Sequence, residues 1–170
     1  MTKTIYKTEK KEDIKSKTFR VWFNFFPAYR RTGGKVVFIS ADYKEIHVQL
    51  GLNRKTKNYV GSVFGGSIYG ALDPVYMLQL IKILGENYVV WDKAALIKFI
   101  KPIKKNVFAK FLITDEILDE IITKVKSAQK YCIDLTTTFQ DVDGIIYAEV
   151  IKTLYIADKE YYKTKKAKQQ

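Results

Sequence analysis

The 170-residue chain has few of the residues that build several common kinds of site. Its one cysteine, Cys132, excludes an internal disulfide and fits a reducing compartment, and we expect a buried, inert thiol because the surrounding run is strand-like. Its one histidine, His47, has no cysteine or second histidine beside it to complete a zinc site, and it suggests no Ser-His-Asp triad. No Gly-rich phosphate-binding motif occurs. The sequence therefore predicts no metal or cofactor.

Segments that enter or cross a membrane are also missing. The N-terminus is polar and rich in lysine, and it lacks the apolar core of a signal peptide. Residues 59–84 form a long apolar run, but the run contains Asp73, Pro74 and Gln79 and lies between strand-like segments. A helix that is apolar all round and buried in protein explains this run better than a transmembrane span does. We expect a soluble, cytoplasmic protein.

The net charge of +12 lies mostly at the two ends of the chain. Residues 1–20 contribute +4 and residues 159–170 contribute another +4. We therefore expect basic tails at 1–11 and 159–170 around one domain with its core at about 34–157, and no specific nucleic-acid partner. A different class of function stays open, in which the tails dock the protein on an anionic membrane or a nucleic acid.

Periodicity predicts an α+β order of elements. A helix over 12–26 places Ile14, Thr18, Val21, Trp22 and Phe25 on one face, and we expect that face to cover a sheet edge or a pocket mouth; a basic membrane-surface helix is the alternative. Two strands follow within 35–50, then an apolar helix over about 66–84 that ends at Gly85. Strands at 88–101 and 106–113, a helix over 115–129 and a hairpin over 131–157 with its turn at Asp143-Gly144 complete the order.

The most specific chemical signal is Asp73, which is the one charged residue between Asn58 and Ile81. A lone carboxylate in an apolar helix costs several kcal/mol unless something specific holds it. Eight residues earlier, the pair Gly65-Gly66 leaves backbone amides exposed at the helix start. A helix N-terminus that polarises an oxygen, with a carboxylate two turns along, is a minimal hydrolytic device.

The residues at these positions resemble a known superfamily. The element order is similar to the hotdog fold, in which a curved antiparallel sheet wraps around one long central helix. The spacing from Asn58 through Phe64-Gly65-Gly66 to Asp73 resembles the signature of phenylacetate-pathway-type acyl-CoA thioesterases. A closer resemblance is to the poorly characterised family of tetrameric acyl-CoA thioesterases, through 58–66, Asp73-Pro74 and the run DKAALIKFIKP at 92–102, which has one residue more than that family's pattern. The resemblance covers about residues 14–157.

The resemblance implies an acyl-CoA thioesterase that works as a homodimer or a homotetramer. The Gly65 amide polarises the thioester carbonyl, Asp73 of the other subunit attacks that carbonyl or activates a water, and Asn58 orients the water or the carbonyl. Substrate contacts are expected from residues near the helix start, along the helix and on the following strand: Phe64, Gly66, Ser67, Tyr69, Tyr76 and Phe99. The phosphates of coenzyme A imply a basic mouth, with these candidates: Arg54, Lys55, Lys57, Lys98, Lys101, Lys104 and Lys105.

Two departures and several alternatives remain at this stage. Phe64 replaces the histidine of the phenylacetate-pathway signature, and Pro74 removes a helix hydrogen bond and is expected to kink the helix. Asp73 can instead bond backbone groups freed by Pro74, Asn58 can be a turn or cap residue, and the two glycines can serve tight helix–sheet packing alone. The lysines can be a solvated surface. The alternative function is a non-catalytic hotdog module that binds acyl-CoA or a lipid-like ligand.

Overall fold

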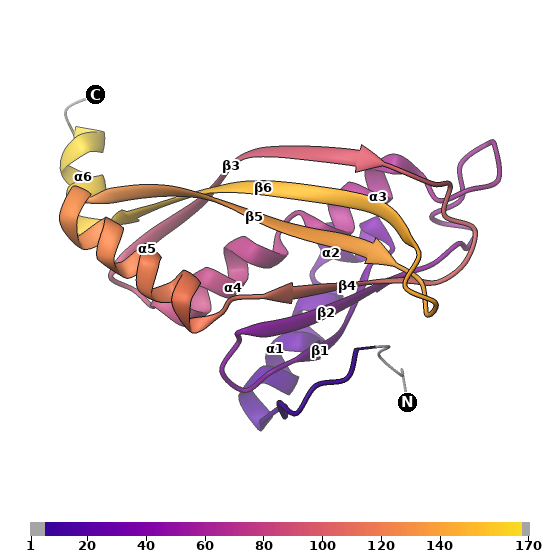
Figure 1. Ribbon diagram of the computed structural model, residues 1–170, viewed down its shortest axis with the longest axis horizontal. Helices are drawn as coiled ribbons and strands as arrows, with labels where there is room; N and C mark the ends of the chain where they lie inside the picture. The colour runs from indigo at the N-terminus through magenta and orange to yellow at the C-terminus, as the bar shows by residue number, and fades with distance from the viewer. Residues whose placement is uncertain (1–5, 168–170) are drawn as a thin grey trace.

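The computed structural model describes residues 6–167 as six strands and six helices. The strands are β1 (Lys35–Ile39), β2 (Glu45–Leu50), β3 (Tyr88–Phe99), β4 (Val107–Leu112), β5 (Lys130–Gln140) and β6 (Ile146–Asp158). They form one antiparallel sheet in the order β1-β2-β4-β5-β6-β3, which curves around a central helical segment (Figure 1). The predicted architecture, a curved antiparallel sheet around a central helix, is confirmed.

The central segment is two helices rather than the one that the apolar run predicts. Helix α3 (Gly65–Leu72) ends at Asp73, and α4 (Val75–Leu84) begins after Pro74 and ends at Gly85. The break lies at the position expected for the kink, because Pro74 has no amide hydrogen to donate to the preceding turn. The last α3 bond runs from the Asp73 amide to the Tyr69 carbonyl. The Asp73 side chain therefore sits at a discontinuity in the helix.

The N-terminal helices bury a different face from the one predicted. In α1 (Ile14–Phe25) the buried residues are Ser16 and Phe23, whereas Ile14 and Phe25 are 83% and 70% exposed. The predicted stripe is wrong because Phe19 and Phe23, one turn apart, supply the contact with the core. Pro27 ends α1 but is also the first residue of α2 (Pro27–Thr32), a position that needs no amide hydrogen.

The two edges of the sheet differ. On the β1 edge, the Asn24 side chain bonds both the amide and the carbonyl of Val36, and Glu12 accepts from the Ile39 amide. These side chains occupy backbone groups that another strand would need. The opposite edge, β3, presents a long exposed stretch in which Leu96, Phe99 and Ile100 are each more than half exposed. An edge strand of this kind leaves a row of backbone groups without a partner strand among the described residues.

The remaining helices cover one end of the sheet. Helix α5 (Asp115–Ala128) buries Ile121 and Val125 against the core, and Thr114 caps its N-terminus. Residues 159–167, expected to be part of a solvated tail, instead form helix α6 (Lys159–Ala167), which follows β6 directly (Figure 1). Residues 1–5 and 168–170, the outer parts of the two expected tails, lie outside the described residues. Across residues 6–167, no helix combines the length and apolarity needed to cross a membrane.

Candidate active site

Asp73 is held by a buried lysine from the sheet. Lys152, on β6, is 1% exposed, and its Nζ lies 2.6 Å from Asp73 Oδ1 and 3.1 Å from Asp92 Oδ1 on β3. The Tyr69 hydroxyl, one helical turn before Asp73, lies 3.3 Å from the same nitrogen. Asp73 keeps 41% of its side chain exposed. The cluster therefore fixes a carboxylate that solvent or a ligand can still reach.

The Lys152 cation offsets the cost of placing two carboxylates close together. Burial alone would lower the pKa of Lys152, but the hydrogen bond that it donates to Asp73 and the charges of Asp73 and Asp92 raise it, so the lysine stays protonated. Burial raises the pKa of Asp92, and Lys152 opposes that shift. Burial also raises the pKa of Tyr69, with a further rise from Asp73, so the phenol stays neutral. One cation thus serves two carboxylates.

An apolar cavity of about 400 Å³ opens beside Asp73. Its walls come from α1 and α2 on one side and from the central helices on the other. The lining includes Trp22, Phe26, Met77 and Leu78 around the carboxylate. The volume is within the range of small-molecule sites. The arrangement places a fixed carboxylate at the wall of an apolar space.

The second predicted element, the start of α3, presents free amides between two aromatic rings. Within residues 6–167, the Gly65 and Gly66 amides have no hydrogen-bond acceptor. A Cβ at Gly65 would lie 3.3 Å from the Phe99 ring, and one at Gly66 would lie 2.4 Å from the Phe64 ring. The glycines are therefore needed for these rings to approach, and the amides point from a positive helix end.

Asn58 lies near this helix start, and much of its hydrogen-bonding capacity is used within its own loop. Its Oδ1 accepts from the Val60 and Ser62 amides, and its Nδ2 donates to Ser62 Oγ. This is the turn role weighed above as the alternative. Asn58 nevertheless lines a second cavity of about 300 Å³ together with Gly65, Phe99 and Lys101. Three of the predicted site residues thus surround the Gly65 helix end.

The other predicted residues separate into different regions. Tyr76 is 2% exposed and packs against Phe111 in the core, with its hydroxyl donated to the Thr136 carbonyl, so burial leaves it no substrate-facing surface. Ser67 is also buried, at the first turn of α3. Lys98 pairs with Glu149 at 3.0 Å. Lys57 is exposed in the loop before α3, and Arg54 lines a third cavity against α1 and α2.

Sequence reasoning missed Lys152 and the role of Asp92 as its second carboxylate. A signal for Lys152 was present, since a lysine interrupts the alternating apolar residues of β6 at a position that faces inward with Val150 and Leu154. An inward lysine on a sheet needs an acidic partner. The N-terminal helix was expected to cover a sheet edge or a pocket mouth, and α1 does both, since Asn24 bonds the β1 edge and Trp22 lines the cavity.

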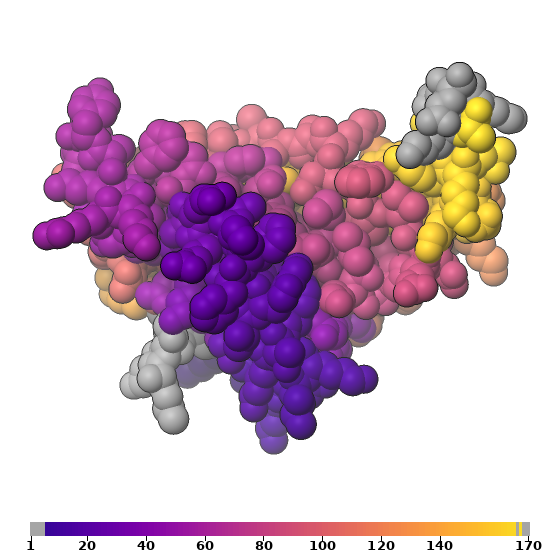
Figure 2. All heavy atoms as spheres, turned by 180° about the vertical axis from the view of Figure 1, so that it is seen from behind, coloured from indigo at the N-terminus to yellow at the C-terminus, as the bar shows by residue number. Residues whose placement is uncertain are grey.

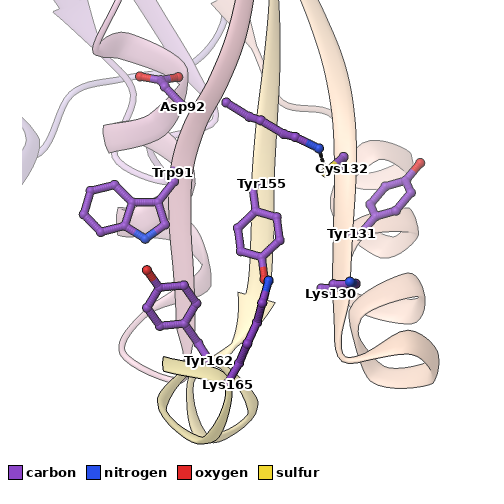
Figure 3. A pocket seen from close by; sticks show the side chains of 9 residues that line it. Trp91, Asp92, Lys130, Tyr131, Cys132, Tyr155, Tyr162 and Lys165 are labelled. Atoms are coloured by element: carbon purple, nitrogen blue, oxygen red, sulfur yellow. Dashed lines mark hydrogen bonds between the residues drawn. The ribbon is translucent and has the colours of Figure 1, made fainter. Parts of the chain in front are cut away.

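The outer face of the sheet carries a separate groove (Figure 3). Cys132, expected to be buried, is exposed there, with Lys93 Nζ 3.7 Å from its sulfur. The expectation was wrong because odd and even residues of β5 face opposite sides, and Cys132 faces outward beside Tyr155. His47 is buried and lies 2.6 Å from Glu45. Among residues 6–167, no group of three or more His, Cys, Asp or Glu side chains is placed to hold a metal ion.

The family described as "Domain of unknown function (DUF4442)" matches residues 15–156. The chain belongs to the DUF4442 family. No curated protein matches this sequence. The sequence resembles the family of tetrameric acyl-CoA thioesterases, but the family that matches carries a different name. Membership of the tetrameric acyl-CoA thioesterases therefore stays a prediction.

Solved structures similar to this DUF4442 protein are hotdog proteins of the thioesterase superfamily. A Pseudomonas aeruginosa protein of unknown function, termed "Probable Thioesterase", has a TM-score of 0.74 at 14% identity, covering 86% of this chain and 98% of that one. A Haemophilus influenzae thioesterase has a TM-score of 0.62 at 11% identity, covering 89% and 96%. Mouse (Mus musculus) thioesterase superfamily member 2 has a TM-score of 0.62 at 11% identity, covering 84% and 98%. These similarities show that the fold is a hotdog.

Proposed function

We propose that this protein is an acyl-CoA thioesterase that uses Asp73 as its catalytic carboxylate. The observation that carries the proposal is the position of Asp73, fixed by Lys152 and half exposed at the wall of an apolar cavity. The acyl chain occupies that cavity, whose lining matches its chemistry. The fold, which similar proteins with thioesterase names share, is consistent with this activity.

The proposed chemistry balances with one carboxylate and one water. Asp73 takes a proton from a water molecule as the water oxygen attacks the thioester carbonyl carbon. Free amides at the start of α3, led by Gly65, stabilise the negative charge that develops on the carbonyl oxygen. The C–S bond then breaks, and the thiolate leaves with the proton that Asp73 took, which gives a free acid and coenzyme A. Direct attack by Asp73, through an acyl anhydride that water hydrolyses, is the second route.

Within a single chain, the Asp73 carboxylate and the Gly65 amide lie apart. Asp73 and Gly65 are eight residues apart on the central segment and line different cavities. Asp73 connects through Lys152 to Asp92 on β3, whereas Gly65 touches Phe99 at the other end of β3. Eight residues at a helical rise of 1.5 Å each put Gly65 and Asp73 roughly 12 Å apart along the central segment, too far for both to reach one carbonyl group. The two halves therefore meet only if a second chain contributes one of them.

The open β3 edge supplies a way to bring the halves together. If two copies pair antiparallel along β3 about a two-fold axis at Leu96, Asp92 of each chain lies opposite Ile100 of its partner, next to Phe99. Each Asp73 then approaches a Gly65 helix end from the other subunit. We propose a homodimer of this kind, with tetramers as pairs of such dimers. The blocked β1 edge is consistent with pairing through β3.

The test is release of free thiol from short-, medium-, long-chain and aryl acyl-CoAs. The wild type is measured beside Asp73→Asn, which keeps the side-chain shape but removes the base. Release by the wild type alone supports the proposal. Saturable acyl-CoA binding without release by either protein would replace it with the alternative, a hotdog module that binds acyl-CoA without turnover. Equal release by both proteins would remove Asp73 from the mechanism.

A further inference from the structure

Positive charge concentrates on one face of the folded domain as well as at the ends of the chain. Residues 14–41 contain six Lys or Arg and no Asp or Glu, and residues 46–72 contain three Lys or Arg and no acid. The first segment supplies α1, α2 and β1, and the second supplies the loop before α3. Figure 2 shows both segments on the same side of the molecule, in indigo and purple. The fold therefore brings two acid-free segments together.

These segments enclose a cleft of about 830 Å³. Five cationic side chains line it, from four separate parts of the chain: Arg20, Arg30, Lys35, Arg54 and Lys55. Arg20 is held by Glu12, with Nε 2.7 Å from Oε1. Within residues 6–167, none of the other four makes an ion pair with a carboxylate of this chain. Like charges gathered around one space without acids repel each other, and an anion relieves that repulsion.

The backbone around the cleft is fixed before any ligand arrives. Gly33 has φ of +82°, and a Cβ there would overlap the Thr56 methyl group, so α2 ends directly against the loop. Asn53 accepts from the Lys55 amide, and the Thr56 hydroxyl donates to the Gly51 carbonyl. Only the long cationic side chains remain to be ordered when an anion binds. Preorganisation of this kind reduces the cost of binding.

The cleft also has an apolar side and a connection to the proposed active site. Val21 and Phe25 line it and are 50% and 70% exposed, which gives an aromatic face against which a flat ring can stack. The Thr56 carbonyl, at the end of the cleft loop, accepts the Phe64 amide at 2.7 Å. Phe64 directly precedes Gly65. The cleft loop is thus tied to the helix end that is proposed to hold the thioester.

We infer that this cleft binds the phosphorylated adenosine end of coenzyme A. The inference rests on the proposed function and deepens it, since it assigns the nucleotide to the cleft between α1, α2 and residues 53–55. Arg30, Lys35, Arg54 and Lys55 contact the phosphates, and Phe25 stacks on the adenine. Lys98, one of the lysines proposed from the sequence for this task, is committed to Glu149 on the outer face of the sheet.

The test compares two double variants that each remove two positive charges. Arg30→Ala with Arg54→Ala alters the cleft, and Lys124→Ala with Lys126→Ala alters exposed positions on α5 as a control. Binding of coenzyme A, of pantetheine and of adenosine 3′,5′-bisphosphate is measured by calorimetry at low and moderate salt. The cleft variant should weaken binding of both nucleotides by about tenfold or more, as expected for losing charge-assisted contacts. The control variant should bind like the wild type. Thermal unfolding checks that both variants are folded.

The outcomes separate this inference from the proposed function. If the protein hydrolyses thioesters, the ratio of kcat/KM for acyl-CoA to that for acyl-pantetheine should fall about tenfold in the cleft variant. If no thiol is released but the cleft variant loses nucleotide binding, the proposed function fails and the inference stands. Equal nucleotide binding by both variants would overturn the inference. Binding to phosphatidylglycerol vesicles without binding to either nucleotide would also overturn it, because the cleft would then be a lipid-headgroup surface.

Discussion

Lys152 Nζ lies 2.6 Å from Asp73 Oδ1, so the one carboxylate of the central helices is held by a buried lysine of the sheet. The contact joins the helix break at Pro74 to strand β6. The ion pair offsets the desolvation cost of placing the Asp73 carboxylate in an apolar helix. The carboxylate has a charged partner and also keeps a solvent-facing side. The structural alternative, in which Asp73 only bonds backbone freed by Pro74, does not account for this ion pair.

Replacing Asp73 should abolish turnover without unfolding the protein. We expect Asp73→Asn to lower kcat by roughly 10²–10⁴-fold, since a general base contributes about that much. Stopped assays of thiol release measure the loss, and circular dichroism checks the fold. In a single turnover in H₂¹⁸O, label in Asp73 identifies direct attack by the carboxylate, whereas an activated water puts the label in the product acid and leaves Asp73 unlabelled.

Replacing Lys152 should affect both stability and activity. Lys152→Met leaves two carboxylates without their cation, and we expect a loss of roughly 2 kcal/mol, less than for a fully buried pair because both carboxylates are partly exposed. The kcat for thiol release should fall by about tenfold or more, because Asp73 loses the contact that holds its carboxylate in place. Asp92→Asn keeps the Lys152–Asp73 contact and serves as the comparison. An unchanged kcat in Lys152→Met would show that the lysine has a structural role only.

A charge on the open sheet edge should separate the subunits. Leu96 lies at the centre of the proposed β3 pairing, so Leu96→Lys places two like charges near the two-fold axis. We expect a shift to monomer in analytical ultracentrifugation, together with loss of activity. Ile122→Lys, at a partly exposed apolar position on α5, is the control and should leave the assembly intact. A wild type that is already monomeric would contradict the pairing itself.

The turn between β5 and β6 should contribute stability that depends on pH. Lys105, 2.6 Å away, and then the amides of the turn lower the pKa of Asp141 from its ordinary 3.8 to about 2. A carboxylate with a lowered pKa in the folded state stabilises the fold above its unfolded value, and this stability is lost as the pH falls from about 4 to about 2. Asp141→Asn should therefore unfold at a lower temperature at pH 6 and lose less stability on acidification than the wild type. Parallel pH curves for the two proteins would refute this assignment.

The features that depend on neighbouring residues alone could be predicted from the sequence. The turn at Asp143-Gly144, the end of the central helix at Gly85 and the break near Pro74 depend on glycine, proline and alternation, which act over a few residues. The buried face of α1 could not be predicted in this way. Phe23 and Trp22 are both apolar, and only packing decides which of them is buried. Lys152, 79 positions from Asp73, meets it only through the sheet.

The site could be anticipated only in part for the same reason. Asp73 is the one charge in an apolar run, and Gly65 belongs to a glycine pair at the start of that run. Both features can therefore be recognised in a single sequence. The basic cleft does not stand out, because its charges come from four separate parts of the chain between Arg20 and Lys55 and the tails dominate the total. The cavity beside Asp73 depends on α1 and α2, whose buried face had been misassigned.

The most direct test of the shared site is complementation between two inactive variants. Asp73→Asn removes the carboxylate, and Gly65→Pro removes the amide hydrogen at a helix position where proline is tolerated. Each variant alone should be inactive. When the two are co-expressed, activity should return to about a quarter of wild type, because half of randomly formed dimers are mixed and each mixed dimer holds one intact site of two. No recovery in mixed dimers, with both variants folded and paired, would contradict a site built from two subunits.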